Sequence, residues 1–212
     1  MTALRTAALA AGLTGLLAAQ AAGQDPRLER LDPDTRIAVA GLVDSARASG
    51  LPAEALIDRA LEGAAKQAPA SRIISAVTTL LSNLRDVRAA LGASATAPEL
   101  EAGASAIHLG VRPAALTRLR VLRARQPLTI ALSVMADLTA RGVPADSAAA
   151  AVLALAGSLR DDQFLAFRRS VERDIELGAP PAAAASSSVR LGAGSLPMSN
   201  GGTSTSMPPR RP

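Results

Sequence analysis

The stretch 69-PASRIISAVTTLLSNLRDVRAALG-92 carries the clearest helical periodicity of the chain and decides its fold. Aliphatic residues recur in it at spacings of four and three: Ile73, Val77, Leu80, Leu84, Val87 and Leu91. At about 100° per residue they form one narrow stripe, which predicts a long helix with a single buried face. We expect this helix to be central to the domain.

Glycine and proline divide the rest of the chain into segments of helical pattern, and no run of alternating β-branched residues interrupts them. Helices are expected at about 32–49, 52–66, 69–91, 98–110, 113–125, 127–141, 144–156 and 161–177. The predicted fold class is therefore all-α, an irregular array of seven to eight short helices.

A weak internal repeat marks the joints between these helices. Gly50-Leu51-Pro52-Ala53-Glu54 and Gly142-Val143-Pro144-Ala145-Asp146 align without gaps, and Gly110-Val111-Arg112-Pro113 is a degenerate third copy. In each copy glycine can end one helix with a positive φ and proline can begin the next, which predicts a helical hairpin joint. Spacings of 60 and 32 residues do not predict a solenoid of fixed period.

The N-terminus, MTALRTAALAAGLTGLLAAQAAGQDP, predicts a signal peptide over residues 1–23. Arg5 precedes a short apolar run, and small residues allow cleavage after Ala21 or Gly23. A retained membrane anchor is the alternative, but a span needs about 20 apolar residues and this run has about 14. We expect an exported protein, periplasmic or secreted, with no transmembrane segment after cleavage.

Residues 24–178 are expected to form a single helical domain, followed by a disordered tail over residues 179–212. The tail is rich in Ala, Ser, Gly and Pro and contains no acidic residue, so it offers little apolar surface to bury. The chain has no cysteine, which excludes disulfides and thiolate metal sites.

The charge balance argues against a nucleic-acid partner. The chain has 23 basic and 18 acidic residues, but Arg5, Arg190, Arg210 and Arg211 lie outside the expected domain, which leaves 19 basic residues in it. A nucleic-acid surface needs a basic excess and, for single strands, stacking aromatic side chains. The chain has neither Trp nor Tyr and only two Phe.

One stretch resembles a pattern found in uncharacterised exported α-helical bacterial proteins. It runs from Gly50-Leu51-Pro52 through Leu61-Glu62-Gly63-Ala64-Ala65-Lys66 to Ile73, about residues 50–73. The resemblance implies an exported helical module and adds no activity or catalytic residue.

Two groups of residues are candidates for binding. Glu62 and Lys66 are spaced for an exposed i, i+4 ion pair; alternatively, the only lysine beside a glutamate and a glycine marks a ligand pocket with Arg72. Arg118 and Arg125 lie together on a helical wheel, either as a solvated face or as a surface for an anionic partner.

No catalytic residue, metal site or cofactor is predicted, because the only histidine, His108, has no visible partner and is expected at a helix end. We favour an exported, non-catalytic interaction or structural module of the cell envelope over an enzyme. Its partner is expected to be another envelope protein or an anionic envelope component, and its oligomeric state stays open. The alternative is a small-ligand-binding protein or enzyme with an inter-helix pocket near Glu62, Lys66 and Arg72.

Overall fold

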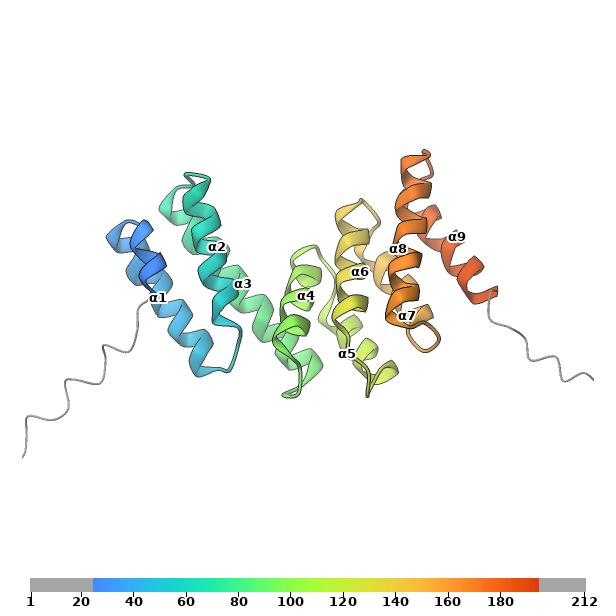
Figure 1. Cartoon of the computed structure of the whole chain (residues 1–212), viewed down its shortest axis with the longest axis horizontal. Coiled ribbons are helices and arrows are strands. Elements are labelled where there is room, and N and C mark those ends of the chain that lie inside the picture. Colours follow the sequence, from blue (N-terminus) through green and yellow to red (C-terminus); the bar gives the residue numbers. More distant parts are fainter. Residues whose placement is uncertain (1–24, 195–212) are drawn as a thin grey trace, which may run out of the picture. The chain divides into compact units, whose positions relative to one another are not determined.

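The computed structural model describes residues 25–194, so the expected signal peptide and residues 195–212 of the expected tail lie outside the described range. Within that range the chain forms one 3-10 helix and nine α-helices, and it contains no strand (Figure 1). None of these helices is both long and apolar enough to cross a membrane. The helices are η1 Pro26–Arg30, α1 Pro33–Ala48, α2 Ala53–Ala65, α3 Ala70–Leu91, α4 Ala97–His108, α5 Pro113–Leu122, α6 Thr129–Ala140, α7 Ala145–Leu155, α8 Asp161–Glu176 and α9 Pro181–Gly194.

The all-α prediction is confirmed, but the helix count is higher than seven to eight because of α9. This helix lies in the segment expected to be disordered, so the predicted tail is wrong for Pro181–Gly194. Ala184 and Ala185 of α9 are each 1% exposed, and the helix packs against α7 and α8. Alanine buries little area per residue, yet its small side chain lets helices approach closely enough to pack.

The helix joints have a common backbone geometry. Gly50, Gly110 and Gly142 have positive φ, and the amide of the next residue donates to a carbonyl five residues earlier, at 2.9–3.0 Å. Gly178 follows the same pattern, since the Ala179 amide donates to the Asp174 carbonyl at 2.9 Å. These bonds satisfy carbonyls at the helix ends that would otherwise lack donors.

The chain divides into two compact units, one ending at Leu81 and one beginning at Ser82. The division falls inside α3, which continues through it without a break. The expected single domain therefore stays a prediction. In the first unit α1 packs against α2 and η1 contacts both, around a core that includes the buried residues Leu28, Val39, Val43, Leu56 and Ile57.

In the second unit the helices form two rows (Figure 1). Helices α4, α6 and α8 follow one another in one row, and α5, α7 and α9 follow one another in the other. The first row is more regular than the expected irregular array, because α4, α6 and α8 begin at Ala97, Thr129 and Asp161, 32 residues apart. The fourth residue of each is fully buried: Leu100, Leu132 and Phe164.

The buried face of α3 is wider than the predicted stripe. Five of the six expected residues are buried, but Leu80 is only half-buried while its neighbour Leu81 is 2% exposed. Leu81 lies about 80° from the centre of the predicted stripe. The four- and three-residue spacing of aliphatic residues thus identified helix α3. It underestimated how much of the helix surface is buried.

Candidate functional site

The end of α2 and the start of α3 line a half-open cavity of about 140 Å³ in the first unit. The structure brings the three predicted pocket residues, Glu62, Lys66 and Arg72, together around it. The full lining is Arg59, Glu62, Gly63, Lys66, Ala68, Arg72, Ile73 and Ala76. The cavity therefore combines charged side chains at its rim with small and aliphatic side chains.

A tight turn places these residues on facing helices. Gln67 has a φ of 54°, the left-handed region that a residue with a side chain adopts infrequently. The Ala68 amide then donates to the Gly63 carbonyl at 2.9 Å, which closes the end of α2. A Cβ on Gly63 would lie 2.8 Å from Cγ1 of Ile73, so the absence of a side chain at Gly63 allows α2 and α3 to approach closely.

Glu62 is engaged at both carboxylate oxygens. Its Oε1 lies 2.5 Å from Nζ of Lys66 and its Oε2 lies 2.8 Å from Nη1 of Arg59. The hydrogen bond from Lys66, followed by that from Arg59, lowers the pKa of Glu62. The carboxyl group stays ionised at neutral pH, so it holds the two cations in place and is unsuited to act as a proton donor.

The rim carries two net positive charges, since Arg59, Lys66 and Arg72 stand against one carboxylate. Arg72 is exposed and forms no ion pair with any residue in the described range. Guanidinium and ammonium groups bind carboxylate and phosphate oxygens. The cavity can therefore hold a small anion whose apolar part faces Ile73 and Ala76.

Four arginines of α5 and the turn after it divide into an outward and an inward pair. Arg118 and Arg125, the predicted anionic-partner residues, are exposed and form no ion pair within residues 25–194. Arg120 and Arg123 turn inward and join α5 to neighbouring helices. The helical wheel paired Arg118 with Arg125, but nothing in the sequence indicated that Arg123 would be buried.

Arg123 is 2% exposed and connects the end of α5 to the start of α8. Its Nη1 donates to the Leu159 carbonyl at 2.7 Å, and its Nη2 lies 2.7 Å from Oδ1 of Asp161. The guanidinium carbon lies 5.2 Å from the ring centroid of Phe164, within cation–π range. These contacts engage both terminal nitrogens and make Arg123 a structural link, while its buried Nε has no hydrogen-bond partner among the described residues.

Glu99 is a second buried charge, 4% exposed, and it joins three helices. One oxygen accepts from the Thr96 amide at 2.9 Å in the capping box of α4, and the other accepts from the Leu128 amide at 2.8 Å and from Arg120 at 3.0 Å. Burial alone would raise the pKa of Glu99, but these hydrogen bonds hold it below its usual value. Capping the start of α4 is thus one of three structural contacts that Glu99 makes.

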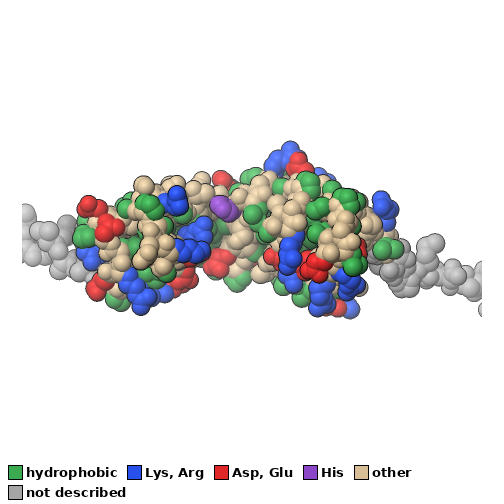
Figure 2. Space-filling model, turned by 90° about the horizontal axis from the view of Figure 1, so that it is seen from above, with side chains coloured by type: hydrophobic (Ala, Val, Ile, Leu, Met, Phe, Trp, Pro, Cys, Tyr) green, Lys and Arg blue, Asp and Glu red, His purple; other side chains and the backbone are tan. Residues whose placement is uncertain are grey.

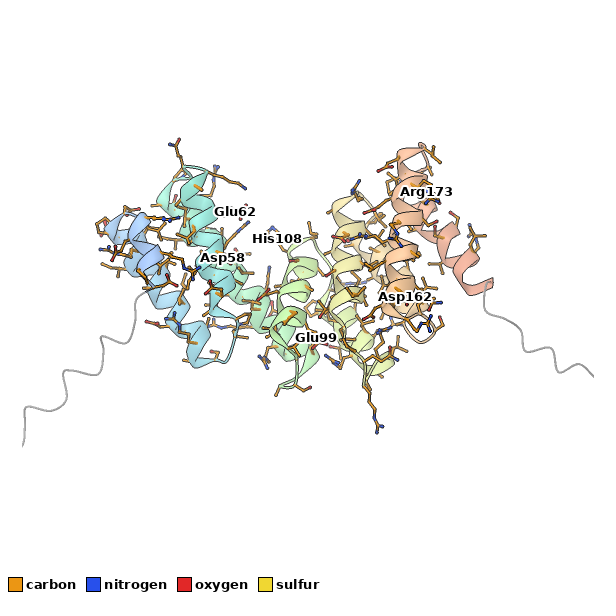
Figure 3. The ribbon with its side chains drawn as sticks, in the orientation of Figure 1. Asp58, Glu62, Glu99, His108, Asp162 and Arg173 are labelled. Atoms are coloured by element: carbon orange, nitrogen blue, oxygen red, sulfur yellow. The ribbon has the colours of Figure 1, made fainter. Side chains whose placement is uncertain are left out.

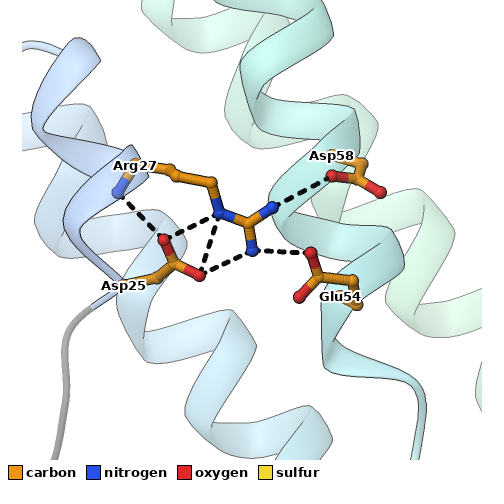
Figure 4. Close-up of polar contacts among 4 residues, drawn as sticks. All are labelled: Asp25, Arg27, Glu54 and Asp58. Atoms are coloured by element: carbon orange, nitrogen blue, oxygen red, sulfur yellow. Dashed lines mark hydrogen bonds and ion pairs between the residues drawn. The ribbon is translucent and has the colours of Figure 1, made fainter.

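A four-residue ion cluster ties η1 to α2 in the first unit (Figure 4). Arg27 lies 2.7 Å from Asp25, 2.5 Å from Glu54 and 3.7 Å from Asp58. Hydrogen bonds from Arg27 lower the pKa of Asp25 to about 2. This cluster gives no local signal in the sequence, because the whole of α1 separates Asp25 and Arg27 from Glu54 and Asp58.

His108 and Glu99 lie at opposite ends of α4 (Figure 3), so they do not form an acid–base pair. His108 is exposed in the last turn of α4, as expected for a helix-end histidine. Among the residues described, no group of three or more His, Cys, Asp or Glu side chains could hold a metal ion.

Comparisons with protein families, curated proteins and solved structures give no match for this chain. Function therefore has to be inferred from the described residues themselves. Figure 2 shows basic and acidic side chains interspersed over the visible face of each unit.

Proposed function

We propose that this protein is an exported, non-catalytic helical module of the cell envelope that presents surfaces for interaction. The second unit supports this proposal, because its two rows of stacked helices resemble the extended scaffolds on which interaction surfaces are built. Export is proposed from the sequence of residues 1–23, which lie outside the described range.

The main support for the proposal is that the buried charged side chains hold helices together. Glu99 and Arg123 are the two buried ionisable side chains of the described range. Both are occupied by backbone amides, carbonyls and an opposite charge at helix ends. A catalytic site requires such groups to face a substrate, whereas these hold helices together.

Export is tested by expressing the chain in a Gram-negative host, separating periplasm from membrane, and sequencing the N-terminus. The expected mature protein begins at Ala22 or Gln24. Recovery of the chain with Met1 intact in the membrane fraction would contradict the proposed export.

A second candidate function is the binding of a small organic anion. The cavity between α2 and α3 favours it, since Glu62, Lys66 and Arg72 meet there with an excess of positive charge. The anionic end of such a ligand would contact Lys66 and Arg72, and its apolar part would contact Ile73.

A thermal-shift screen of small carboxylates and phosphates separates the two candidates. A ligand that raises the unfolding midpoint of the wild type but not of Lys66→Gln/Arg72→Gln would favour the binding function. The matched control is Arg30→Gln/Arg36→Gln, which removes two positive charges of the same unit away from the cavity lining. If the ligand shifts the unfolding midpoints of both double variants equally, the effect is one of general charge and does not come from the cavity.

A further inference from the structure

The C-terminal end of α5 reverses the usual pattern of burial, because a charged residue is buried there and aliphatic residues are exposed. Arg123 is buried there, while two large aliphatic residues, Val121 and Leu122, are 73% and 48% exposed. Adjacent exposed aliphatic residues at one helix end lose the free energy that burial would provide. Contiguous exposed apolar side chains are typical of interaction surfaces.

Two exposed arginines flank this exposed pair along the chain. Arg118 lies three and four positions before Val121 and Leu122, on the same face of α5. Arg125 follows in the turn after the helix, and both arginines are exposed. No Asp or Glu occurs between residues 102 and 136, so the sequence places no acidic neighbour close along the chain.

We infer that Arg118, Val121, Leu122 and Arg125 form a docking surface for an anionic phospholipid bilayer. Val121 and Leu122 enter the boundary between headgroups and acyl chains, and the two guanidinium groups bind lipid phosphates. This inference deepens the proposed function, because it names the anionic envelope component. It can be tested on purified protein whether or not the chain is exported.

The shape of this region favours a bilayer over a groove in another protein. In Figure 1 the end of α5 and the turn after it extend past the lower ends of α6 and α8. A projecting helix end with apolar residues at its tip and arginines on either side can reach a flat surface. Its positive charge complements the negative surface potential of anionic lipid.

The experiment is co-sedimentation of the purified chain with vesicles of phosphatidylglycerol and phosphatidylcholine in equal parts, and with vesicles of phosphatidylcholine alone. Binding is expected only to the anionic vesicles and is expected to weaken as salt is raised. Arg118→Gln/Arg125→Gln should reduce the affinity about 25-fold, at about fivefold for each arginine. Val121→Ser/Leu122→Ser should also reduce it at least about tenfold.

Two matched variants control for charge and for exposed apolar area. Arg169→Gln/Arg173→Gln removes two exposed arginines of α8, and Ile37→Ser/Leu177→Ser removes two exposed aliphatic residues elsewhere. Both should bind within about twofold of the wild type. Because every variant keeps the same N-terminal segment, any contribution of that segment to lipid binding cancels.

Equal binding to neutral and anionic vesicles would overturn the inference, as would wild-type affinity in Arg118→Gln/Arg125→Gln. Binding to polyglutamate without binding to vesicles would overturn it in favour of an acidic protein partner. Circular dichroism melting checks that each variant is folded. If Val121→Ser/Leu122→Ser unfolds, the arginine pair still decides the outcome.

Discussion

Glu99 and Arg123 are buried charges that bind mainly to backbone groups at the ends of helices. The helix expected at about 98–110 has Glu99 near its start, where its bond to the Thr96 amide is local. Its bonds to Leu128 and Arg120 could not be predicted, because they join residues 29 and 21 positions away. Nothing in the sequence near Arg123 indicated that this arginine would be buried.

Arg123→Met should lower the free energy of unfolding by about 1–3 kcal/mol, because the Leu159 carbonyl loses its donor in a buried place. Asp161 adds less, since it is partly exposed and can be hydrated. The measurement is urea denaturation followed by far-UV circular dichroism, because the chain has no Trp or Tyr. Exposed Arg125→Met is the control and should change the value by under ~0.5 kcal/mol.

Glu99 should make stability depend on pH. The pKa of Glu99 is lower in the folded protein than in the unfolded chain, where it is about 4.5. Its ionised form therefore stabilises the fold above that pH, and this contribution is lost as the pH falls through the folded-state pKa. Between about pH 5 and pH 3, the wild type should lose unfolding free energy more steeply than Glu99→Gln.

The comparison for this pH series is Glu101→Gln, which changes an exposed glutamate of the same helix. Its profile should follow that of the wild type. If the unfolding free energy of Glu99→Gln falls with pH as steeply as that of the wild type and of Glu101→Gln, the Glu99 carboxylate does not cause this pH dependence.

Helix boundaries were readable from the sequence because proline and glycine act locally. The eight helices expected from these signals correspond to α1–α8. Helix α9 was missed because its segment was judged by composition, although Gly178-Ala179-Pro180 repeats the Gly-aliphatic-Pro joint. Alanine and serine give a weak periodic signal, so only the joint could have indicated this helix.

Helix α9 should be part of the stable fold. Ala184→Asp places a carboxylate at a position that is 1% exposed, so it should lower the unfolding midpoint by more than about 5 °C. Ala183→Asp makes the same change at the exposed neighbouring residue and should leave the midpoint within about 2 °C. Equal midpoints in thermal melts of the two variants would contradict the packing of α9.

Two helical glycines should respond to alanine in opposite directions. At Gly63 the added methyl group would meet Ile73 at 2.8 Å, and overpacking typically costs about 1–3 kcal/mol, more than the gain in helix propensity. At Gly41 of α1 nothing lies within 4 Å, so alanine should stabilise by about 0.5–1 kcal/mol. Urea denaturation of both variants tests this. Stabilisation by Gly63→Ala would contradict the prediction, because it would mean that the Ile73 side chain moves aside at little cost.

At the scale of the whole chain, the 32-residue spacing of α4, α6 and α8 could not be read from the joints. Gly110 and Gly142 keep that spacing, but the next joint at Gly178 is 36 residues on. The spacing appears only when helix starts and buried positions are compared, as at Leu100, Leu132 and Phe164. Burial of this kind depends on neighbouring helices, which a single segment of sequence does not specify.

The charged rim of the cavity between α2 and α3 also carries the only side-chain amine of the chain. Lys66 is the only lysine in the sequence, and its side chain is 70% exposed. An amine-reactive fluorophore should therefore attach to one side chain and, apart from the N-terminal amine, to no other site. Because an anion bound beside Arg72 would contact the Lys66 amine, its presence should slow this labelling.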